Sequence, residues 1–419
     1  MGTLWRIALR NTLRHKRRTI ITAIVMTAGI SCFIAFDSII AGMDRMAIDN
    51  MEAYTVSSLK LRNPAYVDDI AANPLDKPLA NGEAVLAALA SRGIAATPRI
   101  RFVASVSNYN DSIPVLADAV DPGRDARVFK VASSVRQGSW LGASTPKSVV
   151  MGAALADELG LKVGDAVLVS AQTVSDTTNA DEYEIVGLVD TPALEINHSG
   201  LFMSLADARE LLVAQAAGAG PLVTEVDAAL PRAATLGAAV ASGDRTAAEL
   251  RTALPGVRVD PISSLAKDYL ALRNAKSKYS FVLILVVLLI AAVGIVNTIL
   301  MSIYSRVREI GVLRAYGMTP RDVTRLFLLE GLAVGVVGSA LGVAMGIFFD
   351  FLMIAKGFDL TSMADRFGSL PLSGVLRGEW NPGAIAFGFI FGVVVSLVAA
   401  LVPARQAARM NPTSALRFQ

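Results

Sequence analysis

The residues of this chain that could do chemistry are few and scattered. Its one cysteine, Cys32, lies inside an apolar run, and its two histidines, His15 and His198, lie far apart in the sequence. This composition excludes an intrachain disulfide, a CxxC centre and a histidine-rich metal site. A nucleophile elbow and an HExxH motif are also missing, so the sequence does not predict a hydrolase.

The sequence does not predict that this chain hydrolyses ATP, because it contains no phosphate-binding loop of the required pattern. Such a loop needs GxxxxGK[ST], and the nearest string, GASTPKS, has Pro146 where a glycine precedes the lysine. A proline cannot supply the backbone amide with which these loops hold phosphate. The sequence therefore predicts neither an enzymatic activity nor a bound cofactor for this chain.

Polar residues inside apolar stretches are the remaining candidates for chemistry. Asp37, Glu330 and Asp350 all lie near the ends of such stretches, where burying a charge in a membrane is less costly. We consider Asp37 and Asn297 as candidates for a substrate path. For Asn297, a hydrogen bond between helices is the simpler role.

Four apolar runs hold these residues, at 19–43, 279–304, 327–354 and 383–403. Each is long enough to cross a bilayer as a helix, because about 20 helical residues span about 30 Å of hydrocarbon. The chain is 53% hydrophobic, 18% charged and has a mean hydropathy of +0.51. These values predict a few membrane spans and a sizeable aqueous domain.

Basic residues predict the orientation of the four spans. Residues 1–18 carry six Lys or Arg and no acid, residues 305–326 carry five with two acids, and residues 404–419 carry three with none. The positive-inside rule places these segments and both termini in the cytoplasm, with residues 44–278 and the short loop 355–382 outside. These cations lie at span ends without interleaved aromatic residues, so nucleic-acid binding is not predicted.

The start of the chain fits two interpretations. A basic segment before an apolar run is typical of a signal peptide, but this run is long and the site after Ala41 is poor for cleavage, so we expect an uncleaved span. In residues 1–18, Trp5, Leu9 and Leu13 share one helical face. This pattern predicts an amphipathic helix in the headgroup layer, or a basic stop that only sets topology.

The third run contains glycines at helical spacing. They are Gly331, Gly335, Gly338, Gly342 and Gly346. Small residues at this spacing allow a second helix to approach closely, so that van der Waals packing holds the pair together. The partner helix could belong to this chain or to a second copy.

Residues 44–278 show the alternation and turn residues of an α+β domain on helical stalks. Strands are predicted at 56–62, 100–108, 113–120, 165–172, 183–190, 200–204, 221–229 and 257–261, and helices at 82–91, 151–160, 205–214, 232–238 and 244–252. The stretch of about 111–217 is interpreted as a lobe inserted between two α/β halves.

The segment 305–326 combines charge with a helical pattern. Residues 305–316 predict a short amphipathic helix, and Gly317 suits a left-handed C-cap. The following Thr319-Pro320-Arg321-Asp322 is a capping box with proline at the first helical position.

This segment, SRVREIGVLRAYGMTPRDVTRLFLLEG, resembles the cytoplasmic segment of the FtsX/MacB/LolC/LolE group of ABC transporter permeases. The group carries EIGxLRAxG there, in a helix that docks into the ATPase subunit. The ATPase-coupling candidates are Arg308, Glu309, Ile310, Gly311, Leu313, Arg314, Ala315 and Gly317. The C-terminal VPARQAARMNPTSALRFQ, the stretch VVMGAALADELGLKVGDAVLV, the stretch YEIVGLVDT and the entry NTLRHKRRTIITAI also resemble the group.

The resemblance implies a membrane α-helical protein with four transmembrane helices and a large extracytoplasmic α+β domain of the MacB periplasmic-core type. It implies a multi-pass subunit of the bacterial inner membrane that pairs with a second permease, identical or homologous. Two copies of a separate ATPase subunit would bind ATP and Mg²⁺, and their movement would pass through the stalks to the outside domain.

The single long loop after the first span and its start, YTVSSLKLRNPAYVDD, most resemble the LolC/LolE branch. That branch implies extraction of lipoproteins from the inner membrane, with a periplasmic carrier or an outer-membrane partner and membrane lipids as neighbours. The alternatives are a MacB-type efflux or lipid-export permease and an FtsX-like regulator of a cell-wall hydrolase.

Overall fold

The computed structural model describes residues 16–68, 74–142, 145–213, 222–305, 307–359 and 375–409. Most of the predicted N-terminal amphipathic helix and the end of the predicted cytoplasmic tail lie outside these ranges. The chain forms two compact units. Of the described residues, the helical unit holds 16–44, 272–305, 307–359 and 375–409, and the sheet unit holds 45–68, 74–142, 145–213 and 222–271.

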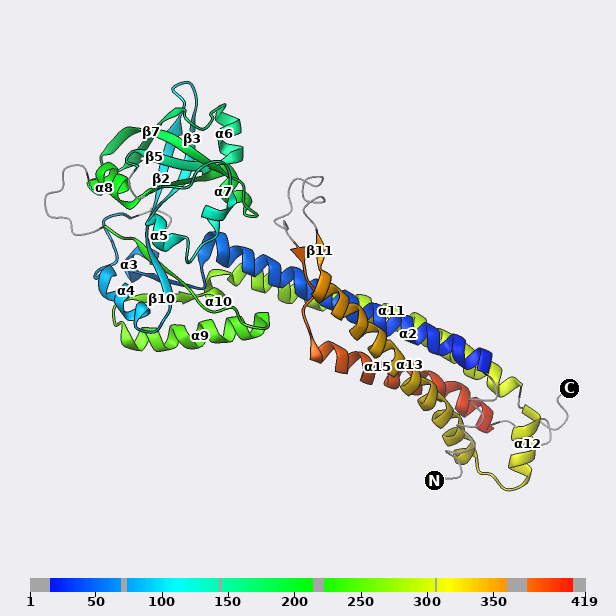
Figure 1. Ribbon diagram of the computed structural model, residues 1–419. Coiled ribbons are helices and arrows are strands. Elements are labelled where there is room, and N and C mark those ends of the chain that lie inside the picture. Colours follow the sequence, from blue (N-terminus) through cyan, green and yellow to red (C-terminus); the bar gives the residue numbers. More distant parts are fainter. Residues whose placement is uncertain are drawn as a thin grey trace. The chain divides into compact units, whose positions relative to one another are not determined.

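Long helices make up most of the helical unit (Figure 1). They are α11 (Lys267–Tyr304), α13 (Pro320–Lys356), α15 (Pro382–Arg409) and the greater part of α2 (Lys16–Met51), joined by the short α12 (Val307–Ala315) and the strand pair β11 (Phe358–Asp359) and β12 (Val375–Leu376). Among the described residues, Ile20–Val56, α13 and α15 are long and apolar enough to cross a membrane. The α11 helix contains the uncharged residues 279–304.

Glycines allow α2, α13 and α15 to pack closely within the helical unit. A Cβ atom added at Gly342 of α13 would lie 2.8 Å from Cβ of Ile30 on α2, and one added at Gly346 would lie 2.8 Å from Cβ of Ile34. Real side chains do not approach so closely, so these positions require glycine. The partner helix for this part of α13 is thus the chain's own α2.

The other side of the α13 groove faces α15. A Cβ atom at Gly335 would lie 2.7 Å from Cβ of Ser396, whose hydroxyl donates a 2.6 Å hydrogen bond to the carbonyl of Gly331. Gly331, Gly335, Gly338, Gly342 and Gly346 are all buried. Small residues and a buried hydroxyl therefore bring three helices of one chain together.

One large sheet organises the sheet unit, with ten strands among the described residues. They are β1 (Leu59–Arg62), β2 (Ala95–Ser107), β3 (Ser112–Val120), β4 (Val135–Gly138), β5 (Ser148–Gly152), β6 (Ala166–Gln172), β7 (Thr178–Val189), β8 (Gly200–Ser204), β9 (Glu225–Ala229) and β10 (Arg258–Pro261). The order is β10-β1-β9-β2-β3-β8-β5-β7-β4, and β6 pairs with both β2 and β7.

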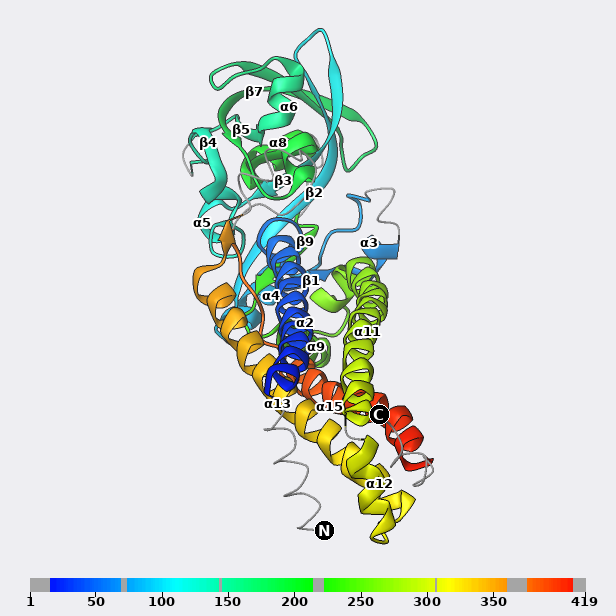
Figure 2. The ribbon, with the colours of Figure 1, turned by 90° about the vertical axis from the view of Figure 1, so that its right-hand side faces the viewer.

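The pairing of β6 closes part of this sheet on itself. The strands β2, β3, β8, β5, β7 and β6 pair in turn, and β6 returns to β2, so they form a ring. The short helices α6 (Ala153–Leu159) and α8 (Leu205–Val213) pack apolar residues against the ring's core, and both views show them beside its strands (Figure 1 and Figure 2). Most of the predicted lobe, about 111–217, lies in this ring.

The 13-residue strand β2 belongs to both parts of the sheet. Its first residues, Ala95–Arg99, pair with β9, whereas Ala104–Ser107 pair with β6 in the ring. The boundary between the two parts therefore runs through β2, and β2 completes the ring although it precedes Asp111. A second core cluster packs α4 (Gly82–Ala90) and α9 (Leu236–Ala253) on the apolar face of β1, β9 and β10.

The helix α9 corrects one detail of the sequence interpretation. Two helices were expected at 232–238 and 244–252, and the structure has one helix, Leu236–Ala253, capped by the Thr235 hydroxyl. Gly243 lies inside it and is buried, with 3.8 Å between its hypothetical Cβ and the side chains of Pro261 and Ile262. The short connections α3 (Pro64–Asp68), α5 (Pro122–Asp125), α7 (Leu194–Ser199), α10 (Ile262–Leu265), the π-helical turn η1 (Glu52–Val56) and the 3-10 turn η3 (Val131–Ser134) complete the sheet unit.

Candidate coupling site

The predicted cytoplasmic segment folds as a short helix between two sharp boundaries. The α12 helix covers Val307–Ala315, and Gly317 follows in the left-handed region with φ of 96°. Thr319 and Asp322 then form the predicted capping box, with Pro320 at the first position of α13. The hydrogen bond from the Thr319 hydroxyl lowers the pKa of Asp322. The glycine turn therefore fixes where α12 ends, and the capping box fixes where α13 begins.

The candidate coupling residues divide between two faces of α12. Ile310 and Gly311 are buried, and Ile310 belongs to the core that α2, α13 and α15 share. Arg308, Glu309, Ala315 and Gly317 are exposed. The side chain of Leu313 lies outside the described residues. One face of α12 thus packs on its unit, and the other carries exposed charged side chains.

Arg314 connects α12 to the end of α15. Its Nη1 donates a 3.1 Å hydrogen bond to the backbone carbonyl of Ala408, and the side chain is half-buried. The last carbonyls of a helix lack partners within the helix, so a guanidinium is well suited to this place. Arg314 therefore positions α12, whereas Arg308 and Glu309 face outward.

The two candidates for a substrate path occupy different settings. Asp37 on α2 is half-buried and accepts a 2.9 Å hydrogen bond from Nδ2 of Asn381, directly before α15. Asn297 is exposed on α11. The hydrogen bond of Asp37 joins α2 to the start of α15.

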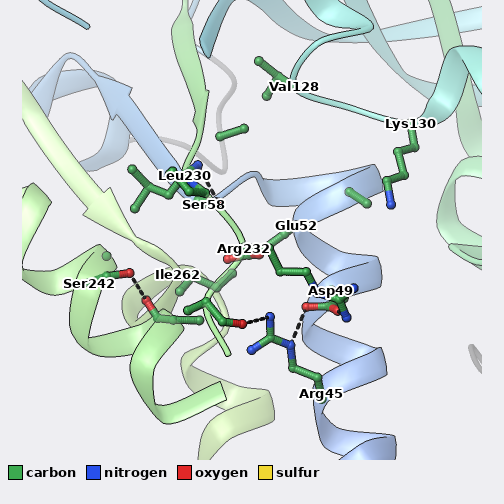
Figure 3. Close-up of a pocket in the computed structure, with 16 residues that line it drawn as sticks. Arg45, Asp49, Glu52, Ser58, Val128, Lys130, Leu230, Arg232, Ser242 and Ile262 are labelled. Carbon is green, nitrogen blue, oxygen red and sulfur yellow. Dashed lines mark hydrogen bonds and ion pairs between the residues drawn. The ribbon is translucent and has the colours of Figure 1, made fainter. Parts of the chain in front are cut away.

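A pocket of about 200 Å³ surrounds the end of α2 in the sheet unit (Figure 3). Arg45 lines the pocket, with Nε 2.8 Å from Asp49 and Nη2 donating a 3.1 Å hydrogen bond to the carbonyl of Ala233. Asp49 also pairs with Arg232 at 2.7 Å. These contacts tie the last turns of α2 to the segment between β9 and α9.

The backbone after α2 strengthens this attachment. Lys130 donates its amide to the carbonyl of Ala53 at 2.8 Å, and Ser58 donates its amide to Ala228 on β9 at 3.2 Å. The π-helical turn η1 lies between α2 and β1, where the helix ends and the chain enters the sheet. The end of α2 and the sheet therefore form one hydrogen-bonded assembly.

Charged side chains fill one face of the sheet, and all of them except Arg101 are buried there. They come from alternate positions of β1, β2, β3, β9 and β10 and from α5; the set is Lys60, Arg62, Arg99, Arg101, Asp118, Asp125, Glu225, Asp227 and Asp260. Arg99 is fully buried, makes bonds of 2.9 and 3.1 Å to the two carboxylate oxygens of Asp125, and lies 3.5 Å from the ring centre of Phe129. Burial without such partners would be very costly.

Lys60 serves two carboxyl groups at once. Its ammonium lies 2.7 Å from Glu225 and 3.4 Å from Asp227. Burial disfavours the charged form of Glu225, but the charges of Lys60 and Arg101 outweigh it and hold its pKa at about 2. Burial raises the pKa of Asp227 to about 6, because Lys60 offsets it only in part and Glu225 adds repulsion.

Two family profiles together match most of the chain. The profile of the MacB-like periplasmic core domain matches residues 19–252, and that of the FtsX-like permease C-terminal region matches residues 281–412. The chain belongs to the FtsX/MacB family of ABC transporter permeases. It is a multi-pass membrane protein with a large α+β domain of the MacB periplasmic-core type, and neither matched region is an ATPase domain.

Relatives of this FtsX/MacB-type permease differ in how much of it they match. LolC of Neisseria meningitidis serogroup B, a lipoprotein-releasing system transmembrane protein, is 23% identical over 337 residues, which are 78% of each chain. A permease of Methanocaldococcus jannaschii is 33% identical over 31% of this chain and 30% of its own length. The macrolide export ATP-binding/permease protein MacB of Salmonella paratyphi A is 33% identical over 31% of this chain and 17% of MacB.

A solved structure is also similar to the permease. It is the extracellular domain of the noncanonic ABC-type transporter YknZ from Gram-positive bacteria, with 13% identity and a TM-score of 0.33 over 48% of this chain and 98% of that domain.

The sequence interpretation missed several residues of this permease that the structure brings together. Arg45, Asp49 and Arg232 form one ionic cluster although Arg232 is far away in the sequence. The alternating charges of β1 and β9 indicated a polar face of the sheet, but alternation alone favours an exposed face. Their burial depends on tertiary packing that has no local signal.

Proposed function

We propose that this chain is a permease subunit that passes ATP-driven movement from a separate ATPase to its extracytoplasmic domain and extracts lipoproteins from the inner membrane. The observation that carries the proposal is the extent of the LolC match. It covers 78% of both chains, whereas the MacB match covers 31% of this chain. A fold alone does not define a cargo, so the cargo needs a direct test.

The mechanical part of the proposal depends on α12 and α2. The exposed Arg308 and Glu309 contact the ATPase, and Arg314 holds α12 against the end of α15. Movement of the helical unit reaches the domain through α2, which continues to Met51 and is attached there by Arg45, as described above. Rigid helices whose ends are hydrogen-bonded are suited to such transmission.

The proposed assembly holds two ATPase copies and a second permease, identical or homologous, with ATP and Mg²⁺ bound by the ATPase. Both termini and α12 lie in the cytoplasm, and the sheet unit lies in the periplasm with a carrier or an outer-membrane partner. A Tyr316→Cys variant in a Cys32→Ser background tests this orientation, because Tyr316 is 88% exposed. Labelling of intact cells by an impermeant thiol reagent would contradict it.

The cargo is tested with the full complex in proteoliposomes. We expect ATP-dependent release of a triacylated lipoprotein to a soluble carrier, and no release of the same protein without its acyl chains. ATP hydrolysis without release of either form would exclude lipoprotein extraction.

A second candidate function is efflux or lipid export of the MacB type. The match of residues 19–252 to the MacB-like periplasmic core domain favours it. Deletion of the gene would then increase sensitivity to macrolides and leave lipoprotein sorting intact. The first proposal predicts the opposite pair of results.

A further inference from the structure

A groove of about 370 Å³ lies between the start of α13 and the end of α15 in the helical unit. The described residues that line it are Pro320, Arg321, Thr324, Arg325, Arg405, Ala408 and Arg409. Four of these seven are arginines, from two different helices, and none is acidic. The four arginine side chains are exposed, so they are accessible to a ligand.

The acid nearest in sequence does not neutralise this groove. Asp322 accepts hydrogen bonds from the amide and the hydroxyl of Thr319, at 3.3 and 2.5 Å. Asp322 also lies 4.0 Å from Arg325, and such an exposed ion pair is weak. Four guanidinium groups that line one groove repel one another, and an anion bound in the groove would reduce that repulsion.

The position of the groove along the helices indicates which kind of anion it would bind. The apolar run of α13 begins at Phe327, two residues after Arg325, and the apolar run of α15 ends at Pro403, two residues before Arg405. A helix rises about 1.5 Å per residue, so Arg325 and Arg405 lie within about one helical turn of the hydrocarbon boundary. The phosphates of membrane lipids lie at this depth, and basic pockets between membrane helices are suited to them.

We propose that this groove, the arginine groove, binds the headgroup of an anionic phospholipid. The planar guanidinium groups of Arg321, Arg325, Arg405 and Arg409 donate to the phosphate oxygens, which a guanidinium can do in bidentate fashion. Ala408 lines the groove and also accepts the hydrogen bond of Arg314 from α12. A bound lipid would therefore stabilise the place where the coupling helix is attached, and binding itself does not depend on the cargo.

The test is a lipid titration of the full-length protein in detergent, followed by native mass spectrometry. The probes are phosphatidylglycerol, phosphatidylcholine of the same acyl chains, and inorganic phosphate. We expect preferential binding of phosphatidylglycerol. The double variant Arg325→Gln/Arg405→Gln should bind it more weakly by about fivefold for each arginine removed, because one cation near a membrane surface contributes on the order of 1 kcal/mol.

Arg308→Gln is the matched control, since Arg308 is an exposed arginine of α12 that does not line the groove. It should keep the affinity of the unchanged protein. An equal loss in Arg308→Gln, equal binding of phosphatidylcholine, or equal binding of inorganic phosphate would overturn the proposal. Unchanged lipid binding in the double variant, combined with loss of ATPase binding, would also overturn it and would assign the groove to the partner protein.

Discussion

Arginines have opposite environments in the two units of this permease. In the sheet unit, Arg99 is completely buried, with both of its paired nitrogens hydrogen-bonded to Asp125. In the helical unit, Arg308 and the arginines of the arginine groove are exposed. The same residue type therefore stabilises the fold in one unit and is accessible to partners in the other.

The difference follows from what each unit uses for packing. The helices α2, α13 and α15 of the helical unit pack through glycine and serine, as at Gly342 against Ile30. The sheet unit instead pairs charges across neighbouring strands, as between Arg101 on β2 and Asp118 directly opposite on β3. Substitutions in the sheet unit should therefore change stability, and those of exposed arginines should change binding.

The largest effect is expected at Arg99. Arg99→Met leaves Asp125 buried without its cation, which typically costs about 3–5 kcal/mol of folding free energy. Thermal unfolding of the full-length protein in detergent, followed by fluorescence, measures the loss. The double variant Arg99→Met/Asp125→Leu should recover much of it, because the unpaired charge is then absent. If Arg99→Met alone were as stable as the unchanged protein, the buried pairs would not be structural.

Close packing in the helical unit gives the next effect. Gly342→Ala places a methyl group 2.8 Å from Cβ of Ile30, and relieving such a contact costs about 1–3 kcal/mol. The matched control is Gly29→Ala on α2, where a Cβ atom has no neighbour within 4 Å. We expect a lower melting temperature for the first variant and an equal or higher one for the second. Equal melting temperatures would show that α2 and α13 separate readily.

These two sites show how far the sequence could be interpreted. The glycines of α13 were predictable, because their spacing signals close packing, but their partners were not, since Ile30 is more than 300 residues away in the chain. The capping box at Thr319 and the left-handed Gly317 were predictable because both depend on local chemistry. Local signals therefore located the ends of α12 and α13.

Other features had no local signal. The ring closed by β6 depends on pairing with β2, and hydrogen bonds between distant strands leave only a weak mark in a sequence. The split of the coupling candidates into an outward face and a buried face also needed tertiary structure, although Ile310 is apolar. The hydrogen bond from Arg314 to the Ala408 carbonyl could not be foreseen, because the EIGxLRAxG motif suggests a contact with the ATPase instead.

The coupling helix is tested at two charged residues, the exposed Glu309 and the half-buried Arg314. Glu309→Ala removes an exposed charge of the proposed ATPase contact, and Arg314→Ala removes a charge-assisted hydrogen bond of about 1.5–3 kcal/mol that positions α12. We expect ATP-dependent transport to fall about tenfold in Arg314→Ala and by less in Glu309→Ala. Thermal unfolding of the sheet unit should be unaffected in both. Full transport by both variants would remove the coupling role of α12.

The last effect is the pH dependence of folding stability, to which Asp227 and Glu225 contribute in different pH ranges. Because the pKa of Asp227 is about 6 in the folded protein and 3.8 ordinarily, the folded state binds an extra proton between these values. Stability should therefore fall as pH rises from about 4.5 to 6, by at most about 1.4 kcal/mol per pH unit. The pKa of Glu225 is lowered, so its contribution disappears only at lower pH. The cations that face Asp227 are Lys60, Arg99 and Arg101.

Asp227→Asn should abolish this slope, since asparagine does not titrate and can still accept the 2.9 Å hydrogen bond from the Ser57 hydroxyl. Melting temperatures of the full-length protein at several pH values measure it. Glu249→Gln on α9 is the control, because Glu249 is exposed and its replacement should leave the slope in place. A slope that persisted in Asp227→Asn would assign the titration to another group.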